Sequence, residues 1–517
     1  MFPALPSMHT LRTLLRGSLI RTRSLWIFGK ARWLVGLALA ALGTLGTLLG
    51  VPELNQQMRT EIPGLRCWFP VPMDDAKFTV ALAPFVEVDI NGRVRITGDG
   101  RELARLLFAR LEAGFEELEL DVPYELRSPD QTCPVKGADR ETRAAAAETA
   151  AATLGADVLI YGALVQEAAP DAGAVSQTAQ LQPEFYVSYR GFAEAADLVG
   201  PYDLGRSLRV NVPVRSRDLE GIADHPVNTR ARALALIALG LASYAVDDYQ
   251  QAYDYFAAAE AVPNWPDSAG KELIYLLLGN ASSNLATITL DSIYAEEALD
   301  HYDRALAIEP AFARALVGMA GATYQLALGD LETRRSSGVD PALLDEAEAL
   351  YRQALNTPAP EAAEIPLKVH FGLGQVFLVR HYLYATDSEA DGWLEQARAE
   401  FQSIVNAYES GQTSEGDKTP VRNTDIVGHA YARLGLIAAQ FDQDPAAAIP
   451  LYEQAVRLVT PRWQAFYQID LGDLYARQND PDAARSHFEE ALAIAELYGN
   501  EEMVQRAETR LAELPSP

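Results

Sequence analysis

Apolar and polar residues alternate with a helical period along most of the second half of the chain. Leu471 to Glu496, LGDLYARQNDPDAARSHFEEALAIAE, has two apolar-striped arms on either side of a polar middle. Gly472 and Tyr475 share one face of the first arm, and Ala484 and Phe488 share one face of the second, at the spacing of amphipathic helices. The Asn-Asp-Pro sequence between the arms predicts a turn, because proline suits the start of a helix. This segment is therefore predicted to form a hairpin of two helices.

The same spacing of small and aromatic residues occurs five more times in the preceding sequence. Each copy begins with a leucine or methionine followed by a glycine or alanine. The six pairs are Leu239-Gly240, Leu278-Gly279, Met319-Ala320, Leu373-Gly374, Leu434-Gly435 and Leu471-Gly472. This pattern resembles the tetratricopeptide repeat, in which leucine-glycine, tyrosine, alanine, phenylalanine and proline recur over about 34 residues. The alternative is an unrelated all-helical bundle, but nothing in such a bundle would require the same residue spacing to recur in six copies.

The resemblance covers residues 233–499 in about six repeats and implies an α-solenoid of stacked helix hairpins. Residues 500–517 are predicted to add a capping helix and tail, because one face of this segment is apolar and the other charged. In such a solenoid, the first helices of the repeats line a concave groove that holds a peptide or a partner helix. The register of the copies gives these candidate partner-binding residues: Leu273, Asn280, Asn284, Lys368, Phe371, Gln375, His429, Leu436, Phe466, Asp473 and Arg477.

For each candidate, the alternative is packing against the neighbouring helix. Some members of the family clamp the carboxyl terminus of a chaperone with lysine and asparagine side chains. Asn280 matches one of those positions, but Leu276 stands where the lysine is required. The resemblance therefore does not imply chaperone-tail binding, and the partner is expected to be another protein or peptide.

The amino-terminal part of the chain has a different composition. Residues 33–51 form an uncharged apolar run of 19 residues, close to the roughly 20 that a membrane-spanning helix needs. Six basic residues and no acidic residue precede this run. By the positive-inside rule, the pattern predicts a single transmembrane helix over 33–51, a cytoplasmic basic arm over 1–32 and extracytoplasmic domains after the helix. A cleaved signal peptide and an organelle transit peptide are the alternatives.

Charge and cysteine content limit the partners further. The chain has a net charge of −28 at pH 7, and the basic arm makes the remainder more acidic still. Nucleic acid is excluded as a partner of this remainder, because like charges repel. Gly46 and Gly50 have the spacing that lets two membrane helices pack, so homo-oligomerisation stays open. Cys67 and Cys133 either form a disulfide or are two free thiols.

The period of the apolar pattern changes between a predicted stalk, residues 52–76, and a predicted linker, residues 216–232. Strands are predicted at 78–88, 156–165, 185–189 and 209–214, and helices at 101–115 and 138–154. The segments VALAPF and LGADVLIYGAL resemble the TolB amino-terminal-like domain of bacterial envelope and sensor proteins. This resemblance implies a small α/β sheet domain over residues 77–215. Such sensors carry an effector module before the membrane helix, but 32 residues are too few to fold as one.

The motifs of the chain do not indicate catalysis, a metal or a cofactor. Gly98-Asp99-Gly100 is predicted to be a turn, because Leu103 stands where a dinucleotide-binding loop needs its third glycine. The seven histidines form no HExxH pattern and no ligand spacing with the cysteines. Paired acids such as Glu116-Glu117 are typical of solvated helix faces.

The sequence thus predicts an α+β multidomain protein with one transmembrane helix, an α/β sheet domain and a solenoid of tetratricopeptide-like hairpins. The function expected of this architecture is a non-catalytic, membrane-anchored scaffold of the bacterial cell envelope that binds protein or peptide partners in the concave groove. The alternative is the receptor half of a signalling system whose effector is a separate chain.

Overall fold

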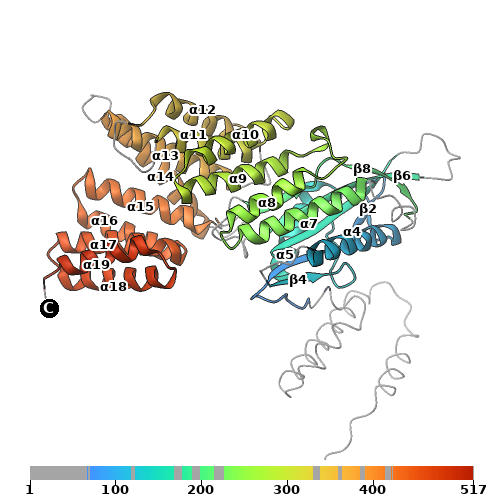
Figure 1. The fold of residues 1–517 in the computed structure, drawn as a ribbon, viewed down its shortest axis with the longest axis horizontal. Helices are drawn as coiled ribbons and strands as arrows, with labels where there is room; N and C mark the ends of the chain where they lie inside the picture. Colours follow the sequence, from blue (N-terminus) through green and yellow to red (C-terminus); the bar gives the residue numbers. More distant parts are fainter. Residues whose placement is uncertain are drawn as a thin grey trace, which may run out of the picture. The chain divides into compact units, whose positions relative to one another are not determined.

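The computed structural model describes residues 67, 70–117, 123–167, 177–188, 198–214, 226–329, 338–358, 364–384, 390–413, 421 and 423–515. Residue contacts divide the chain into two units, Met1–Val71 and Pro72–Pro517. The second unit contains a sheet followed by a series of helix hairpins (Figure 1). Both cysteines are described, and neither is a free thiol.

The sheet of the second unit is mixed. Its strands are β1 (Phe78–Leu82), β2 (Val86–Val88), β3 (Val94–Arg95), β4 (Tyr124–Arg127), β5 (Val158–Gln166), β6 (Gln177–Val187), β7 (Gly200–Asp203) and β8 (Leu208–Val212). The order is β3-β2-β5-β1-β4, and β6 pairs with β5, β7 and β8. The pairs of β1 with β4 and β5, and of β2 with β5, are parallel. The pairs that involve β3 or β6 are antiparallel.

The predicted strand over residues 78–88 is divided into β1 and β2. Pro84 lies at the break, where a residue without an N–H group cannot continue a ladder of hydrogen bonds. Both pieces still pair with β5, since Val80 lies beside Val158 and Val86 lies beside Ala163. Strands β3, β4 and β7 were not predicted. The residues of β4 are all half-buried without alternation, and β7 begins with the turn-forming sequence Gly-Pro.

Two helices pack with the sheet, α4 (Gly98–Glu117) and α5 (Arg140–Leu154). The prediction that Gly98-Asp99-Gly100 forms a turn is wrong, because these residues make the first turn of α4. A Cβ atom at Gly100 would lie 2.2 Å from the carbonyl oxygen of Phe85, so the close approach of helix and strand requires glycine. Asp99 accepts a hydrogen bond of 2.9 Å from the backbone N–H of Val214.

The described helices after the sheet form hairpins of a first and a second helix. The pairs are α7 (Pro226–Tyr244) with α8 (Tyr249–Glu260), α9 (Glu272–Thr289) with α10 (Ser292–Ile308), α11 (Ala313–Ala327) with α12 (Pro341–Leu355), α13 (Ile365–Leu383) with α14 (Ala390–Thr413), α15 (Thr424–Gln440) with α16 (Pro445–Leu458), and α17 (Pro461–Arg477) with α18 (Pro481–Leu497). Helix α19 (Glu501–Glu513) packs on α18. First helices also contact one another directly, α9 with α11, α11 with α13 and α13 with α15, so they form a continuous row.

The hairpins share one packing arrangement, in which a glycine of the first helix lies against an aromatic ring of the second. A Cβ atom at the glycine would lie between 2.3 and 2.8 Å from the ring. The pairs are Gly240 with Phe256, Gly279 with Tyr302, Gly374 with Phe401, Gly435 with Tyr452, and Gly472 with Phe488. The third hairpin differs, because Ala320 replaces the glycine. Tyr351 of α12 lies against Gly372 of the following first helix, α13.

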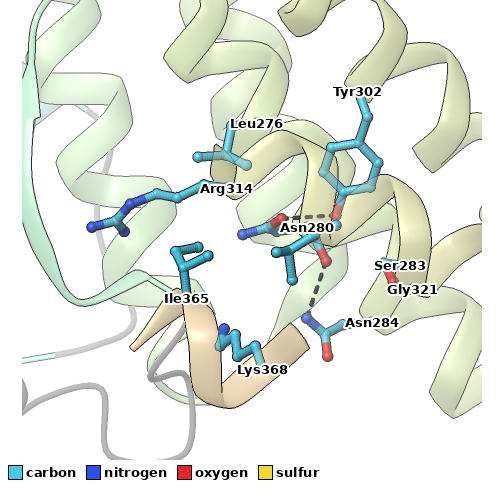
Figure 2. A pocket seen from close by; sticks show the side chains of 11 residues that line it. Leu276, Asn280, Ser283, Asn284, Tyr302, Arg314, Gly321, Ile365 and Lys368 are labelled. Carbon is cyan, nitrogen blue, oxygen red and sulfur yellow. Dashed lines mark hydrogen bonds between the residues drawn. The ribbon is translucent and has the colours of Figure 1, made fainter. Parts of the chain in front are cut away.

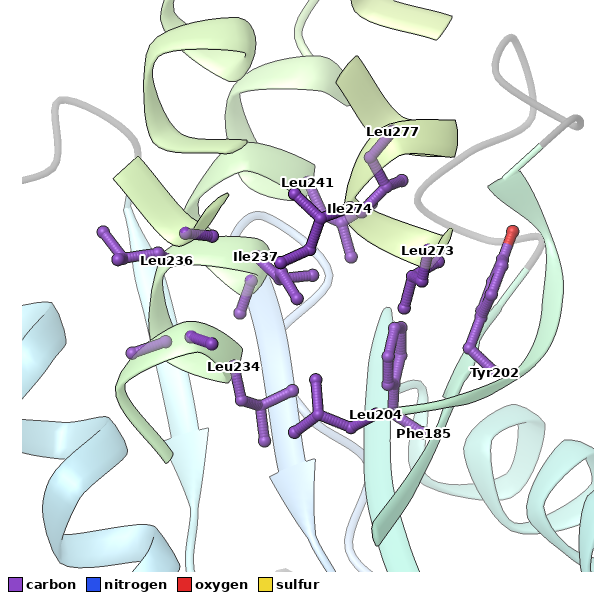
Figure 3. Packing of buried hydrophobic residues seen from close by; sticks show 14 of the residues in the cluster. Phe185, Tyr202, Leu204, Leu234, Leu236, Ile237, Leu241, Leu273, Ile274 and Leu277 are labelled. Carbon is purple, nitrogen blue, oxygen red and sulfur yellow. The ribbon is translucent and has the colours of Figure 1, made fainter. Parts of the chain in front are cut away.

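The sheet and the first hairpins share one hydrophobic core. Figure 3 shows Phe185 and Leu204 of the sheet region facing Leu234 and Ile237 of α7, with Leu273 of α9 beside them. Helix α7 also packs against α4. The predicted linker over residues 216–232 overlaps this helix, which begins at Pro226 and is buried on nearly all sides. The sheet therefore continues directly into the row of first helices.

The predicted fold class and localisation require one correction. Across the described ranges, no helix combines the length and the apolar composition needed to cross a membrane. The longest, α14, carries charged residues such as Asp391, Arg398 and Glu400 along its 24 residues, and the apolar residues of α9 are buried against neighbouring helices. The apolar run at 33–51 lies outside the described residues. The described residues form an α+β fold, in which a mixed sheet with its helices is followed by a helical solenoid. The transmembrane helix and the single-pass topology that were predicted are not part of this described fold.

Candidate functional site

A pocket of about 220 Å³ lies where three successive first helices, α9, α11 and α13, come together. Figure 2 shows the side chains of α9, of α11 and of the first turn of α13 around it. The pocket is lined by Leu276, Asn280, Ser283, Asn284, Tyr302, Arg314, Val317, Gly318, Gly321, Ile365 and Lys368. Three of the predicted partner-binding residues, Asn280, Asn284 and Lys368, are among them.

The two asparagine side chains of the pocket are held by hydrogen bonds. Oδ1 of Asn280 accepts a bond of 2.8 Å from the hydroxyl of Tyr302. Nδ2 of Asn284 donates to the carbonyl oxygen of Asn280 at 3.0 Å and to the hydroxyl of Tyr244 at 2.5 Å. Because a side-chain amide has two donor hydrogens and two acceptor lone pairs, these bonds orient the amides while leaving them further hydrogen-bonding capacity. The pocket thus offers pre-oriented polar groups between apolar walls.

Two cationic residues belong to the lining, Lys368 on α13 and Arg314 on α11. The guanidinium group of Arg314 donates to the carbonyl oxygen of Val199 at 3.0 Å and to the hydroxyl of Tyr202. It also lies 4.5 Å from the centre of the Tyr202 ring, which gives a cation–π contact. Arg314 therefore connects the pocket to strand β7 of the sheet.

Arg314 was not among the predicted residues, although the register contained the signal. Lys368 lies six residues before the glycine of its repeat, as do the predicted residues His429 and Phe466. Arg314 lies six residues before Ala320, which takes the place of glycine in the weakest copy. The same register, applied to this copy, predicts Arg314 as a residue that faces the groove.

The other predicted residues are spread along the row of first helices, outside the pocket. Leu273 is 5% exposed and belongs to the core shared with the sheet. Gln375 and Leu436 are half-buried, and Arg477 is exposed. Asp473 forms an ion pair of 2.9 Å with Arg510 of α19. These positions stay predictions as partner contacts.

A series of aromatic residues follows the row from α13 to α17. The ring of Phe371 lies 6.1 Å from His429, and His429 lies 5.2 Å from Trp463. Trp463 in turn lies 5.5 Å from Phe466. Nδ1 of His429 is 2.6 Å from the hydroxyl of Tyr467. Burial lowers the pKa of His429 to about 4, so the imidazole is neutral at physiological pH.

Charge is divided unequally between the two kinds of helix. The six first helices contain eight lysines and arginines and four aspartates and glutamates. The six second helices contain five basic and eighteen acidic residues. The acidic character of the solenoid thus comes from its second helices, whereas the first helices have a surplus of positive charge.

Comparison with known proteins gives one family. The tetratricopeptide repeat family matches residues 427–496, which span α15 to α18. No curated protein matches the sequence. Among solved structures, a tetratricopeptide repeat protein from Parabacteroides merdae is 14% identical, with 57% of this chain and 89% of that chain covered and a TM-score of 0.36. A thermophilic tetratricopeptide repeat protein from Thermus thermophilus is 15% identical, with 54% and 99% covered and a TM-score of 0.25.

The family match agrees with the glycine–aromatic packing of Gly435 with Tyr452 and of Gly472 with Phe488 within the matched range. The match thus covers the last two hairpins of the described solenoid, α15 to α18.

Proposed function

We propose that this chain is a non-catalytic scaffold that binds a segment of a protein partner along the row of first helices. Tetratricopeptide repeats generally bind protein partners, and stacked hairpins present their first helices as an extended binding surface. The observation that carries the proposal is the pocket between α9, α11 and α13. Ligand sites are typically concave, with a few fixed polar groups between apolar walls, and this pocket has both.

The arrangement suits an extended peptide. Asn280 and Asn284 are one helical turn apart, and their amides are held in place by Tyr302 and Tyr244. Oriented side-chain amides can pair with the N–H and C=O groups of a peptide backbone without demanding a particular side chain. Leu276 and Val317 supply apolar surface beside them.

A variant that fills the pocket tests the proposal. A Cβ atom at Gly321 would meet only the hydroxyl of Tyr351, at 3.8 Å, so Gly321→Leu places a side chain in the pocket without a backbone clash. Gly392→Leu on α14 is the matched control, because a Cβ atom there meets nothing within 4 Å. A library of random 12-residue peptides displayed against the full chain is expected to yield binders that Gly392→Leu retains and Gly321→Leu loses. If the two variants bind the selected peptides equally, or if no peptide is enriched, the proposal is wrong.

A further inference from the structure

We propose that a buried arginine at the junction of the sheet and the solenoid binds a monovalent anion of the size of chloride. The residue is Arg230 on α7, which is 4% exposed. It lines a cavity of about 10 Å³ between α7, α4 and the sheet, and a cavity of this volume holds one particle of the size of a water molecule. The inference is independent of the proposed function, since this cavity shares no lining residue with the pocket between α9, α11 and α13.

The guanidinium group of Arg230 is held in place from several sides. Its Nη2 donates a hydrogen bond of 2.7 Å to the carbonyl oxygen of Ala269. Its Cζ lies 3.9 Å from the centre of the Trp265 ring, and a Cβ atom at Gly205 would lie 2.9 Å from the same atom. The carbonyl oxygen of Ala269 also accepts from Nε1 of Trp265 at 3.2 Å and from the backbone N–H of Arg206 at 3.1 Å. Because a carbonyl oxygen has two lone pairs, its capacity is already used, and it cannot serve the other donors of Arg230.

Those other donors are buried without a partner. Nε and Nη1 of Arg230 have no hydrogen-bond partner among the described residues. Glu272 attracts the arginine, but its own Oε2 is likewise buried without a partner in the described part of the chain. Burial lowers the pKa of Arg230 to about 10, so the group is charged at neutral pH, and burial raises the pKa of the Glu272 carboxyl, which disfavours its negative charge. Buried charges are normally paired, and the side chains around Arg230 do not supply the counter-charge.

The lining of the cavity favours an anion over a water molecule. Apart from Arg230, it consists of apolar side chains: Phe85, Leu103, Leu107, Leu181, Pro183, Leu204 and Val227. A buried water molecule typically makes about three hydrogen bonds, and this lining offers it no polar side chain besides the arginine. A halide ion needs only donors, accepts from N–H groups in any direction and supplies the missing negative charge. The volume favours such a single-atom anion over sulfate, phosphate or a carboxylic acid.

The position of the site gives the anion a structural role. Gly205 lies in the turn between β7 and β8, and Gly270 lies in the turn before α9. A Cβ atom at Gly270 would lie 2.6 Å from Cα of Gly205, so the two turns are in close contact beside Arg230. An anion that neutralises Arg230 would therefore stabilise the contact between the sheet and the first two hairpins.

Thermal unfolding of the full chain tests the proposal when chloride replaces gluconate at constant ionic strength. Above the dissociation constant of the site, each tenfold rise in chloride concentration is expected to raise the unfolding temperature by roughly 2 °C, because an ion that binds only the folded state stabilises it by mass action. Bromide locates the ion directly. Crystals grown in sodium bromide are expected to give an anomalous peak in the cavity beside the guanidinium group of Arg230.

Three variants separate anion binding from structural damage. Arg230→Met removes the charge and is expected to abolish the dependence on chloride, but it also loses the contacts with Ala269 and Trp265. Val227→Ile keeps the arginine and adds one methylene group to the cavity wall, so it is expected to abolish the dependence by filling the cavity. Arg457→Met removes an exposed cation from α16 and is expected to keep the full dependence.

Four outcomes would overturn the proposal. The first is an unfolding temperature that does not change with chloride, or changes equally in Arg230→Met. The second is a bromide peak in the cavity without chloride-dependent stability, which would indicate an adventitious ion only. The third is stabilisation by acetate but not by chloride, which would assign the arginine to a carboxylate ligand. The fourth is an equal loss of stability in Arg230→Met and Glu272→Gln without any effect of chloride, which would show that Glu272 is the counter-charge.

Discussion

The hydroxyl of Tyr302 on the second helix α10 donates a hydrogen bond of 2.8 Å to Oδ1 of Asn280 on the first helix α9. The ring of Tyr302 lies between two first helices, because Cβ atoms at Gly279 of α9 and Gly318 of α11 would both fall within 3 Å of it. A residue that packs two hairpins together thus also orients a polar group of the pocket. Helix packing and the proposed peptide binding would therefore both depend on Tyr302.

Removal of the Tyr302 hydroxyl is expected to affect both properties. In Tyr302→Phe the ring still fills the space beside the glycines, but Oδ1 of Asn280 loses a buried donor. We expect the free energy of unfolding to fall by about 1 kcal/mol and the affinity for selected peptides to fall with it. Urea unfolding and fluorescence anisotropy measure the two effects. Tyr294→Phe, on the same helix but outside the pocket lining, should change neither. Unchanged peptide affinity in Tyr302→Phe would mean that Asn280 does not need this bond to bind.

The glycine–aromatic packing makes a second prediction. A Cβ atom at Gly472 would lie 2.3 Å from the ring of Phe488, which is 1% exposed and has little room to move. Gly472→Ala is therefore expected to destabilise the protein by about 1–3 kcal/mol through overpacking, although alanine favours helix. Gly392→Ala meets no neighbouring atom and should raise stability by up to about 1 kcal/mol. Thermal unfolding of the two variants tests this prediction. A shift of the unfolding temperature in the same direction for both would contradict the role assigned to the repeat glycine.

The core shared by the sheet and the first hairpins predicts coupled stability. Leu273 of α9 is buried among residues of both parts, so Leu273→Ala should cost about 2–5 kcal/mol. Hydrogen exchange is expected to accelerate in β6 and β7 as well as in α7 and α9. Ile469→Ala in α17, at 0% exposure in a separate cluster, should accelerate exchange in α17 and α18 and leave β6 unchanged. Confinement of the Leu273→Ala effect to the helices would show that the sheet folds independently.

The neutral state of His429 predicts a pH dependence. Burial, and secondarily the charge of Arg433, lowers the pKa of His429 from 6.5 to about 4 in the folded chain. Between these values the unfolded chain binds the proton and the folded chain does not, so the contribution of His429 to stability rises as pH increases from about 4 to 6.5. His429→Gln should remove this rise when urea unfolding is measured across the range. Identical slopes for the two proteins would contradict the lowered pKa.

Asp470 on α17 is expected to act in the opposite direction. Burial raises its pKa from 3.8 to about 6, despite Arg506 at 3.7 Å. The folded chain then keeps a proton that the unfolded chain has lost, so stability falls as pH rises from about 4 to 6. In Asp470→Asn this fall should be absent. The free energy of unfolding of the variant should therefore rise more steeply with pH than that of the unaltered protein. NMR titration of the Asp470 carboxyl carbon checks the pKa directly.

Much of the solenoid could be predicted from sequence because its packing is local. The glycines at 240, 279, 374, 435 and 472 each meet an aromatic residue of the next helix, and both partners lie within one repeat. The third hairpin was the weakest copy because Ala320 stands where the other copies have glycine. Tyr351 still lies against Gly372 of the following first helix, as Tyr302 lies against Gly318. The same weakness concealed Arg314, and with it the connection from the pocket to the sheet.

The parts that were missed depend on contacts between distant segments. Strand β4 has no alternating pattern because its four residues are all half-buried, and it is recognisable only beside β1. The contact of the sheet with the solenoid left one signal in the sequence. Residues 233–244, ALALIALGLASY, contain no charged residue, and all of them are buried, whereas a helix at the edge of a solenoid would keep a polar face. The membrane prediction concerned residues outside those described, and the described helices do not supply a span.

The attachment of α7 to the sheet also limits how this array can change length. Repeat arrays usually gain or lose units at any point, since each hairpin touches only its neighbours. Here the first hairpin shares a hydrophobic core with the sheet, and α19 packs on the last hairpin. The second and third hairpins also contact the sheet region through Leu273 and Arg314. Duplication or deletion of a unit is therefore tolerable only beyond them and before the last hairpin, where each hairpin meets others of its own kind.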